Sequence, residues 1–358
     1  MSKTIVLTGG GSAGHVTPHL ALIPQLQKEG YSVAYIGSKD GIEKDMMAEQ
    51  QIDYTGVSTG KLRRYKDLNN LKDPFRVLKG ITEARKALKK LKPSLVFSKG
   101  GFVSVPVVIA AKTLGIPCVL HESDRSPGLA NKIVLRFCEK ICVTFPETAS
   151  LLPEGKAIHT GAIVRPDLFK GNAAKGRTLC DFSSSKPVLL VMGGSMGAQK
   201  INDTIRTELD VLLSTFHVIH ICGKGKIDPN VQQYGYKAFD YVSSELSDLL
   251  ACTDVVVSRA GSNAINEFLA LRIPMLLVPL SPRVSRGDQV ENAASFEKQG
   301  FASVVQEEEL NSDTLHAQIN ELYTKREDIQ ERMKSADAYT DGTQVVAIFK
   351  DIISRKEK

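Results

Sequence analysis

Short apolar runs alternate with longer stretches of helical periodicity along the whole chain. This pattern predicts strands joined by helices, as in parallel sheets that are covered on both faces. The pattern restarts after Arg165-Pro166, so we predict an α/β protein with two Rossmann-like, doubly wound domains. The predicted strands are Thr4–Thr8, Ser32–Ile36, Leu95–Ser98, Cys118–His121, Lys140–Val143, Pro187–Met192, His217–Cys222, Val255–Ser258 and Met275–Val278.

The two halves carry glycine-rich turns at matching places. The first strand of each half runs into such a turn, Gly9–Gly14 and Gly193–Gly197, and a later strand runs into a second one, at Gly100–Gly101 and at Gly261. Ligands of doubly wound sheets lie at the carboxyl ends of the strands, so we expect the domains to face each other across a cleft lined by these turns. We expect domains at 1–163 and 164–335, joined through 153–166, and a helix at 336–358 that packs back on the first domain.

The bulk composition excludes several classes of protein. A hydrophobic content of 42% is enough for ordinary cores and argues against disorder. No apolar run approaches the ~20 residues that span a bilayer, and the first residues do not resemble a signal peptide. The six cysteines form no Cys-x-x-Cys pair, so we expect reduced core thiols in a cytoplasmic protein.

The net charge of +6 is unevenly distributed. Between Lys61 and Lys92 stand twelve basic and three acidic residues, so this segment carries +9 and the rest of the chain −3. Apolar residues interleave with the cations, which suits an anionic membrane surface; the alternative is a solvated helix face. Nucleic-acid binding is disfavoured because no DNA or RNA motif accompanies the charge. The candidate membrane residues are Lys61, Arg63, Arg64, Lys66, Phe75, Arg76 and Lys79.

The first glycine turn is a poor dinucleotide fingerprint. Gly9, Gly11 and Gly14 fit the Gly-x-Gly-x-x-Gly spacing, but the acidic residue that would hold a ribose is represented only by the poorly placed Asp40. His15 is the more specific feature, because an imidazole at the mouth of such a turn can act as a base or hold a substrate hydroxyl. We expect His19 to serve packing or the helix surface.

The helix start after Gly261 is a candidate anion site. Ser262 or Asn263 is expected to cap the helix, and its first amides would face an anion. Glu267, in the first turns, either complements the helix dipole or grips two vicinal hydroxyls of a ribose. Arg259 suits a phosphate, because its guanidinium is planar and always charged.

Other catalytic motifs are missing from the sequence. It has no Asp-x-Asp, no cluster with metal-ligand spacing, no Walker motif and no Gly-x-Ser-x-Gly elbow, so we expect neither a cofactor nor a dedicated metal. The polar pair Asp288-Gln289 follows a loop at a strand end, where it can meet sugar hydroxyls.

Several short motifs occur in the order in which one known family has them. They are Gly9-Gly-Gly-Ser-Ala-Gly-His15, Lys99-Gly-Gly-Phe-Val-Ser-Val-Pro106, His121-Glu122, Gly128-Leu-Ala-Asn131-Lys132, Thr160-Gly-Ala-Ile-Val-Arg165, Gly193-Gly-Ser-Met-Gly-Ala198, Arg259-Ala-Gly-Ser262, Glu267 and Asp288-Gln289 with Asn292-Ala293. In this set the sequence resembles the peptidoglycan N-acetylglucosaminyltransferases of glycosyltransferase family 28. The resemblance implies a GT-B fold. It also implies inverting transfer of GlcNAc from UDP-GlcNAc to the 4-hydroxyl of undecaprenyl-diphosphate-MurNAc-pentapeptide, the step from lipid I to lipid II.

The same resemblance implies roles for individual residues. The implied UDP-GlcNAc residues are Ser12, Ala13, Gly14, Arg165, Ser195, Arg259, Ser262, Asn263, Ala264, Glu267 and Gln289. The implied acceptor-side residues are Lys99, Gly100, Gly101, His121, Asp124 and Asn131. Glu267 would hold the ribose, Ser195 a phosphate, and the two arginines the diphosphate. A single displacement needs a base for the acceptor hydroxyl, and we expect His15 in that role or beside it, with Glu122 as the alternate catalytic residue.

The family also implies a setting. The enzyme would be peripheral on the inner face of the cell membrane, with the lipid-linked acceptor and proteins of cell-wall synthesis as partners. Two departures affect single contacts. Many relatives have Gln-Asn where this chain has Ser123-Asp124, and Gln-Gln where it has Asp288-Gln289.

Four rival functions stay open at this point. One is a related enzyme with another lipid acceptor, such as a diacylglycerol glucosyltransferase, and one is a UDP-GlcNAc 2-epimerase-like isomerase that needs no acceptor. An NAD-dependent dehydrogenase is disfavoured by the second glycine turn. The last is a sugar-nucleotide-binding protein without catalysis.

Overall fold

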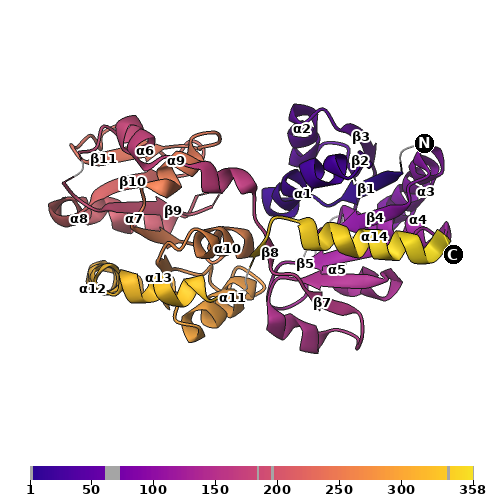
Figure 1. The fold of residues 1–358 in the computed structure, drawn as a ribbon. Helices are drawn as coiled ribbons and strands as arrows, with labels where there is room; N and C mark the ends of the chain where they lie inside the picture. Colours follow the sequence, from indigo (N-terminus) through magenta and orange to yellow (C-terminus); the bar gives the residue numbers. More distant parts are fainter. Residues whose placement is uncertain (1–2, 61–72, 184, 195–196, 337–338, 358) are drawn as a thin grey trace. The chain divides into compact units, whose positions relative to one another are not determined.

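The computed structural model describes residues 3–60, 73–183, 185–194, 197–336 and 339–357. The chain forms two compact units (Figure 1). Unit 1 comprises Met1–Arg165 together with Tyr339–Lys358, and unit 2 comprises Pro166–Ala338.

Unit 1 is built on a parallel sheet of seven strands in the order β3-β2-β1-β4-β5-β6-β7. The strands are β1 (Thr4–Thr8), β2 (Ser32–Ser38), β3 (Asp53–Val57), β4 (Leu95–Ser98), β5 (Cys118–Glu122), β6 (Lys140–Val143) and β7 (Ala157–His159). The helices are α1 (Thr17–Lys28), α2 (Ile42–Glu49), α3 (Asp73–Leu91), α4 (Ser104–Thr113) and α5 (Leu129–Val134), with 3₁₀ turns at η1 (Ala13–His15), η3 (Leu135–Phe137) and η4 (Pro146–Leu151).

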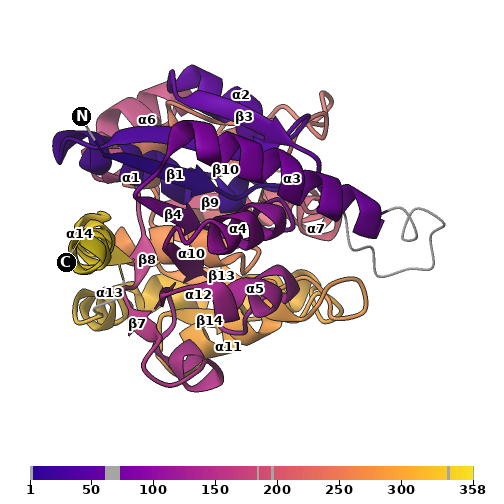
Figure 2. The same ribbon diagram turned by 90° about the vertical axis from the view of Figure 1, so that its right-hand side faces the viewer.

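Helices cover both faces of this sheet because successive strand residues point to opposite sides. Ile5 and Leu7 of β1 pack with residues of α1, such as Leu22. Val6, between them, packs on the other face with residues of α3 and α4, such as Leu88. Figure 2 shows α3 running beside α4 on that face.

The strand order of unit 1 reverses at β1. The chain goes from β1 to β2 and β3 on one side, then crosses back to β4 on the other side. Strands β1 and β4 pair in parallel from Ile5 with Leu95 to Thr8 with Ser98. Their carboxyl ends therefore lie next to each other, and the turns that follow them meet at the point where ligands of such sheets bind.

Unit 2 repeats this plan with six parallel strands in the order β11-β10-β9-β12-β13-β14. The strands are β9 (Val188–Met192), β10 (His217–Ile221), β11 (Tyr236–Phe239), β12 (Val255–Ser258), β13 (Met275–Leu277) and β14 (Ala302–Val304). Its helices are η5 (Pro166–Lys170), α6 (Ala173–Cys180), α7 (Gln199–Thr207), α8 (Leu209–Thr215), α9 (Leu246–Ala251), α10 (Ser262–Ala270), α11 (Asp288–Lys298), α12 (Ser312–Thr324) and α13 (Arg326–Lys334). The strand order reverses between β9 and β12, which are adjacent in this sheet as β1 and β4 are in unit 1.

The prediction of two parallel α/β sheets in separate domains is confirmed. The predicted strands did not include β3, β7, β11 and β14, all of which lie at sheet edges. An edge strand has one neighbour and keeps part of its surface in water, so its apolar signal is weak. The half-buried Asp53–Val57 is an example.

The end of the chain belongs to unit 1. Strand β15 (Tyr339–Thr340) pairs with β8 (Ala162–Ile163), and α14 (Thr343–Glu357) then packs beside α1. In Figure 1, α14 is the yellow helix that runs to the C-terminus. Phe349 of α14 is fully buried, and its ring lies 5.0 Å from that of Phe97 in β4. This helix thus completes the core on the α1 face of the sheet.

The six cysteine thiols are buried, and none forms a disulfide. Burial raises the pKa of the Cys142 thiol to about 12, which keeps it protonated and unreactive at neutral pH. No helix in the part of the chain that the structure describes is both long and apolar enough to cross a bilayer.

We expect Phe349→Ala to lower the free energy of unfolding by about 3–5 kcal/mol, because removing this fully buried ring leaves a cavity in the core. Urea unfolding followed by circular dichroism measures this loss. Phe75→Ala is the matched control, since that ring is 73% exposed. A loss below ~1 kcal/mol for Phe349→Ala would show that α14 adds little to the stability of unit 1.

Candidate functional site

The two glycine turns of unit 1 lie against each other at the reversal point. Gly101 has a φ of +77°, and a Cβ atom there would lie less than 3.0 Å from the carbonyl oxygen of Gly10 and 3.3 Å from Nδ1 of His15. On the other turn, a Cβ atom at Gly9 would meet the His15 carbonyl oxygen at 2.8 Å and Cβ of Lys99 at 3.3 Å. Glycine is therefore required at Gly9 and Gly101 for the close approach.

His15 is the last residue of η1 and is half-buried. Its backbone N–H donates to the carbonyl of Ser12, and its Nδ1 lies 2.9 Å from the hydroxyl of the same residue. The short turn from Ser12 to His15 thereby fixes the imidazole from two directions. A ring held in this way at the carboxyl edge of a sheet suits acid–base work.

Lys99 follows β4 and is almost completely buried. Its ammonium lies 2.7 Å from Nδ1 of His121 and donates to the Ser123 hydroxyl at 2.8 Å. Burial lowers the pKa of Lys99 to about 8, although Glu122 and Asp124 oppose the fall. The pKa of His121 lies well below its usual range because of burial and the neighbouring Lys99, so that ring is neutral and accepts from the ammonium.

The buried Glu122 carboxylate organises the loop that follows β5. One oxygen accepts from the backbone N–H of Asp124 at 3.0 Å. The other accepts from the N–H of Gly128 at 2.9 Å and from the side chain of Asn131 at 2.7 Å. Burial and the nearby Asp124 raise the pKa of Glu122, while these hydrogen bonds oppose the rise. The loop from 123 to 131 is thus folded around this carboxylate.

The remaining acceptor-side residues lie in the same place. A Cβ atom at Gly100, whose φ is +88°, would lie 2.6 Å from the amide oxygen of Asn131, so the turn after β4 also touches the start of α5. His19 is buried between the rings of Tyr35 and Phe97, at 5.3 and 5.6 Å, and burial lowers its pKa to about 3. His19 is therefore a neutral core residue.

In unit 2 the start of α10 differs from the expected one. Its N-cap is Gly261, which has no side chain, so the prediction that Ser262 or Asn263 caps the helix is wrong. Both residues lie inside the first turn together with Ala264, and the Ser262 carbonyl accepts from Asn266 at 2.8 Å. Gly261 is extended there, with φ −70° and ψ 127°, and begins the helix by its backbone alone. Glu267 lies one turn further, half-buried.

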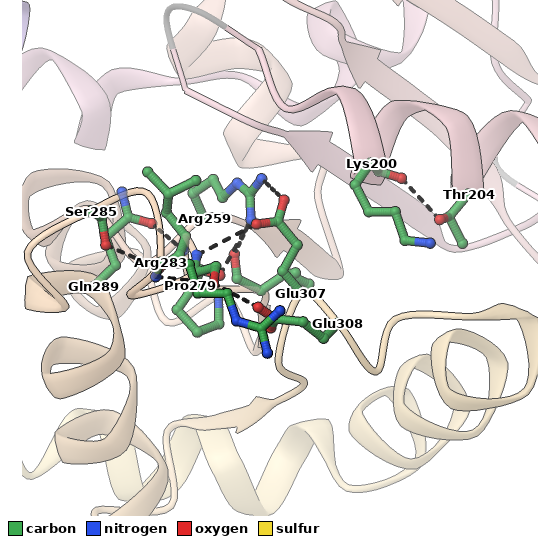
Figure 3. A network of polar contacts seen from close by, with 12 residues as sticks. Lys200, Thr204, Arg259, Pro279, Arg283, Ser285, Gln289, Glu307 and Glu308 are labelled. Carbon is green, nitrogen blue, oxygen red and sulfur yellow. Dashed lines mark hydrogen bonds and ion pairs between the residues drawn. The ribbon is translucent and has the colours of Figure 1, made fainter.

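Arg259, between β12 and α10, is the centre of a polar network (Figure 3). Its guanidinium donates to the carbonyls of Val278 and Pro279, at 3.1 and 3.3 Å, and pairs with Glu307. Gln289, at the start of α11, accepts from the backbone N–H of Leu280 at 2.9 Å. Lys200 and Thr204 of α7 lie apart from this cluster in the same view. The network pins the loop after β13 to the carboxyl edge of the sheet.

The structure thus divides the predicted residues between the units. Unit 1 brings together His15, Lys99, Gly100, Gly101, His121, Glu122, Asp124 and Asn131, and it also holds Ser12, Ala13, Gly14 and Arg165. Unit 2 holds Arg259 between β12 and α10, Gln289 at the start of α11, and Ser262, Asn263, Ala264 and Glu267 on α10. Ser195 lies outside the described residues.

The predicted basic and apolar surface is described only in part. Lys61, Arg63, Arg64 and Lys66 lie outside the residues that the structure describes. The first turns of α3 expose Phe75 and Leu78, at 73% and 61%, and on the same helix Arg76 and Lys79 are exposed. Large apolar side chains that face water next to cations are a feature that needs an explanation.

The sequence interpretation missed two polar residues of these clusters. They are Glu43, which is buried under the first turn, and Glu307, which pairs with Arg259. Neither has a local sequence signal. Ser123, which the sequence interpretation named only as a departure from relatives, accepts from Lys99. Over the described ranges, no three or more His, Cys, Asp or Glu side chains are grouped as a metal ion requires.

Comparison with known proteins matches both domains of this chain to one family. The model of the glycosyltransferase family 28 N-terminal domain matches residues 5–143, and that of the C-terminal domain matches 188–353. The UDP-N-acetylglucosamine–N-acetylmuramyl-(pentapeptide) pyrophosphoryl-undecaprenol N-acetylglucosamine transferase of Geobacillus kaustophilus is 54% identical over 353 residues, 98% of this chain and 99% of the relative. The transferase of the same name from Clostridium botulinum strain Alaska E43 is 54% identical over 96% of this chain and 97% of its own.

Solved structures show the same fold. The crystal structure of MurG from Acinetobacter baumannii matches with a TM-score of 0.78 at 23% identity and covers 98% of this chain and 99% of that one. The glycosyltransferase of kitacinnamycin matches with a TM-score of 0.72 at 18% identity, over 93% of this chain and 94% of its own. The fold is therefore GT-B-like.

The buried ammonium of Lys99 predicts a pH-dependent contribution to stability. Its pKa is about 8 in the folded protein and about 10.4 in an unfolded chain, so between these values the unfolded state binds more protons and stability rises with pH. We expect the free energy of unfolding of the wild type, measured relative to Lys99→Met, to increase by about 2 kcal/mol from about pH 7.5 to about pH 10. Urea titrations at both pH values measure it. Lys112→Met, at an exposed position, should show no such change. If the free energy of unfolding depends on pH equally in both variants, Lys99 does not carry a buried charge with a lowered pKa.

Proposed function

The chain belongs to glycosyltransferase family 28, and we propose that it transfers GlcNAc from UDP-GlcNAc to the 4-hydroxyl of the muramyl sugar in undecaprenyl-diphosphate-MurNAc-pentapeptide. The observation that carries this proposal is the 54% identity to transferases of that name over 98% of the chain. At this coverage both domains are shared with the relatives. The enzyme is thus assigned to the last lipid-linked step of peptidoglycan precursor synthesis.

We assign acceptor activation to unit 1. In the proposed displacement the acceptor oxygen forms a bond to the anomeric carbon, the bond from that carbon to the diphosphate breaks, and the hydroxyl proton passes to His15. Ser12 holds the imidazole for this step through its 2.9 Å contact with Nδ1. Glu122 already accepts three hydrogen bonds from its own loop, which favours His15 over Glu122 as the base.

We assign donor binding to unit 2. Departure of UDP leaves negative charge on the diphosphate, which the N-terminal amides of α10 and a guanidinium can stabilise without a metal. Arg259 lies directly before that helix start, and Gln289 anchors the neighbouring loop for the sugar. Glu267, within α10, is the proposed partner of the ribose hydroxyls. Ser195 and, from the end of unit 1, Arg165 are the remaining proposed diphosphate contacts.

We further propose that unit 1 lies on the inner surface of the cell membrane, where a lipid-linked acceptor is anchored. The support is the pair of exposed apolar side chains Phe75 and Leu78 beside Arg76 and Lys79 at the start of α3. Apolar groups enter the headgroup region while the cations meet anionic lipid. Lys61, Arg63, Arg64 and Lys66, which lie outside the described residues, stay part of this proposal on their charge alone.

The test of the function is a transfer assay with UDP-GlcNAc and a short-chain diphospho-MurNAc-pentapeptide acceptor. We expect one GlcNAc to be added per acceptor, with turnover reduced at least ~100-fold in Gly101→Ala, since a Cβ atom there collides with the Gly10 carbonyl of the turn that carries His15 and presses on the imidazole itself. Gly115→Ala is the matched control. Its φ of +69° is equally strained, but its Cβ atom would meet nothing within 4 Å.

Other outcomes of this assay separate the rivals. Transfer to diacylglycerol but not to the muramyl acceptor would replace the proposed acceptor, and conversion of UDP-GlcNAc without any acceptor would favour an epimerase. Reduction of NAD by an alcohol would favour a dehydrogenase, and donor binding without turnover would favour a non-catalytic protein. Equal turnover of the two glycine variants would remove His15 from the proposed site.

The membrane proposal predicts the effect of negative charge at Phe75 and Leu78, the exposed apolar residues of α3. Phe75→Asp combined with Leu78→Asp should weaken binding to vesicles of anionic phospholipid at least ~10-fold, because two apolar anchors are lost and two negative charges are added. Vesicle sedimentation measures the binding. Tyr234→Asp combined with Tyr241→Asp is the control, because these rings are also exposed, at 76% and 67%, but lie in unit 2. If both pairs weaken binding equally, α3 is not the membrane surface.

A further inference from the structure

Glu43 is a fully buried acidic residue in the first turn of α2, directly beside the first glycine turn. One carboxylate oxygen accepts from the backbone N–H of Ser38 at 2.9 Å and from the hydroxyl of the same residue at 2.5 Å. The other accepts from the N–H of Gly11 at 3.4 Å. A buried carboxylate carries a large desolvation penalty, so it persists only where donors surround it.

Three glycines leave room for this carboxylate. A Cβ atom at Gly10, Gly37 or Gly41 would lie less than 3.0 Å from an atom of the Glu43 side chain. These glycines come from the turn after β1, from β2 and from the start of α2, so three separate segments close around one carboxylate. Because these three positions lack side chains, the backbone can enclose the carboxylate closely from three directions.

The carboxylate is linked to His15 through the turn. Gly11, whose N–H points at Glu43, is followed by Ser12, whose hydroxyl lies 2.9 Å from Nδ1 of His15. At the other end of the turn, the carbonyl of Gly9 accepts from the buried hydroxyl of Tyr35 at 2.9 Å. The turn is therefore held by the protein interior at two points, and Gly11, which Glu43 holds, is the one nearer to His15 along the chain.

We propose that Glu43 is a positioning residue for the transfer reaction. In other glycine-rich turns the backbone N–H groups bind a phosphate of the ligand. Here the Glu43 carboxylate of the protein itself accepts from such an N–H group, and it thereby fixes the turn that carries His15. The acceptor diphosphate is accordingly bound elsewhere than at the Gly11 amide. This inference rests on the proposed function.

The first test is Glu43→Gln, which keeps the size of the side chain and removes its charge. An amide cannot accept from Ser38 and from Gly11 with both of its ends, so the turn loosens. We expect kcat to fall about 10–100-fold and the KM and dissociation constant for UDP-GlcNAc to change much less, because the donor residues Arg259, Glu267 and Gln289 lie in unit 2 and only Ser12, Ala13 and Gly14 are on this turn. In protein with ¹³C-labelled histidine, the ring signal of His15 should shift. Asp45→Asn, at an exposed position of the same helix, is the matched control.

The second test displaces the carboxylate and keeps its charge. Gly41 has an extended backbone, with φ −91° and ψ 159°, that alanine adopts freely, but its Cβ atom would collide with the Glu43 carboxylate and with the Ser38 hydroxyl that donates to it. Gly41→Ala should lower kcat like Glu43→Gln, and the double variant should be no worse than either single one, because both act through the same contact. If Glu43→Gln does not fold, Gly41→Ala alone decides.

The outcomes separate this inference from the function on which it rests. A wild type without transfer activity overturns the proposed function. An active wild type overturns only the role of Glu43 if both variants keep wild-type kcat and an unshifted His15 signal. The role of Glu43 is also overturned if the two variants raise the KM for UDP-GlcNAc and leave kcat unchanged. It is overturned as well if the kcat losses of the single variants multiply in the double variant.

Discussion

The contact between two glycine turns at the strand reversal of unit 1 is the constraint on which the proposed acceptor site depends. Because β1 and β4 are adjacent and parallel, the segments after Thr8 and Ser98 leave the sheet at the same edge. They fit together only because Gly9 and Gly101 have no side chains. That close approach sets the backbone of His15 beside Lys99, and it joins a half-buried imidazole to a buried polar interior.

Buried charge is the second organising feature of unit 1. Glu43, Lys99 and Glu122 are all removed from water at the carboxyl edge of one sheet, and each is met by local partners. Because an unpaired buried charge is costly, each of these groups orders the loop around it. Glu43 orders the turn after β1, and Glu122 orders the loop after β5. The rigidity of the site is therefore electrostatic as well as steric.

Unit 2 uses the same architecture in a different way. Its helix α10 begins at a bare Gly261, so the start of the helix is presented by the backbone. The neighbouring Arg259 is oriented by two carbonyls and by Glu307. A guanidinium and helix amides are groups that stabilise an anion, which suits a nucleotide diphosphate. The two proposed sites thus differ in the residues that each unit places on one common plan.

The sequence by itself determined the alternation of strands and helices, the two-domain plan, the glycine turns and His15, because each depends on residues close together in the chain. Periodicity did not reveal edge strands such as β3, whose residues stay partly in water. Nor did it distinguish Glu43 from Lys44 and Asp45, which follow it on the same helix but are exposed. Only the tertiary structure decided which of these charges is buried and which partners Lys99, Glu122 and Arg259 have. The physical reason is that burial and pairing are set by segments distant in sequence that meet at one edge of a sheet.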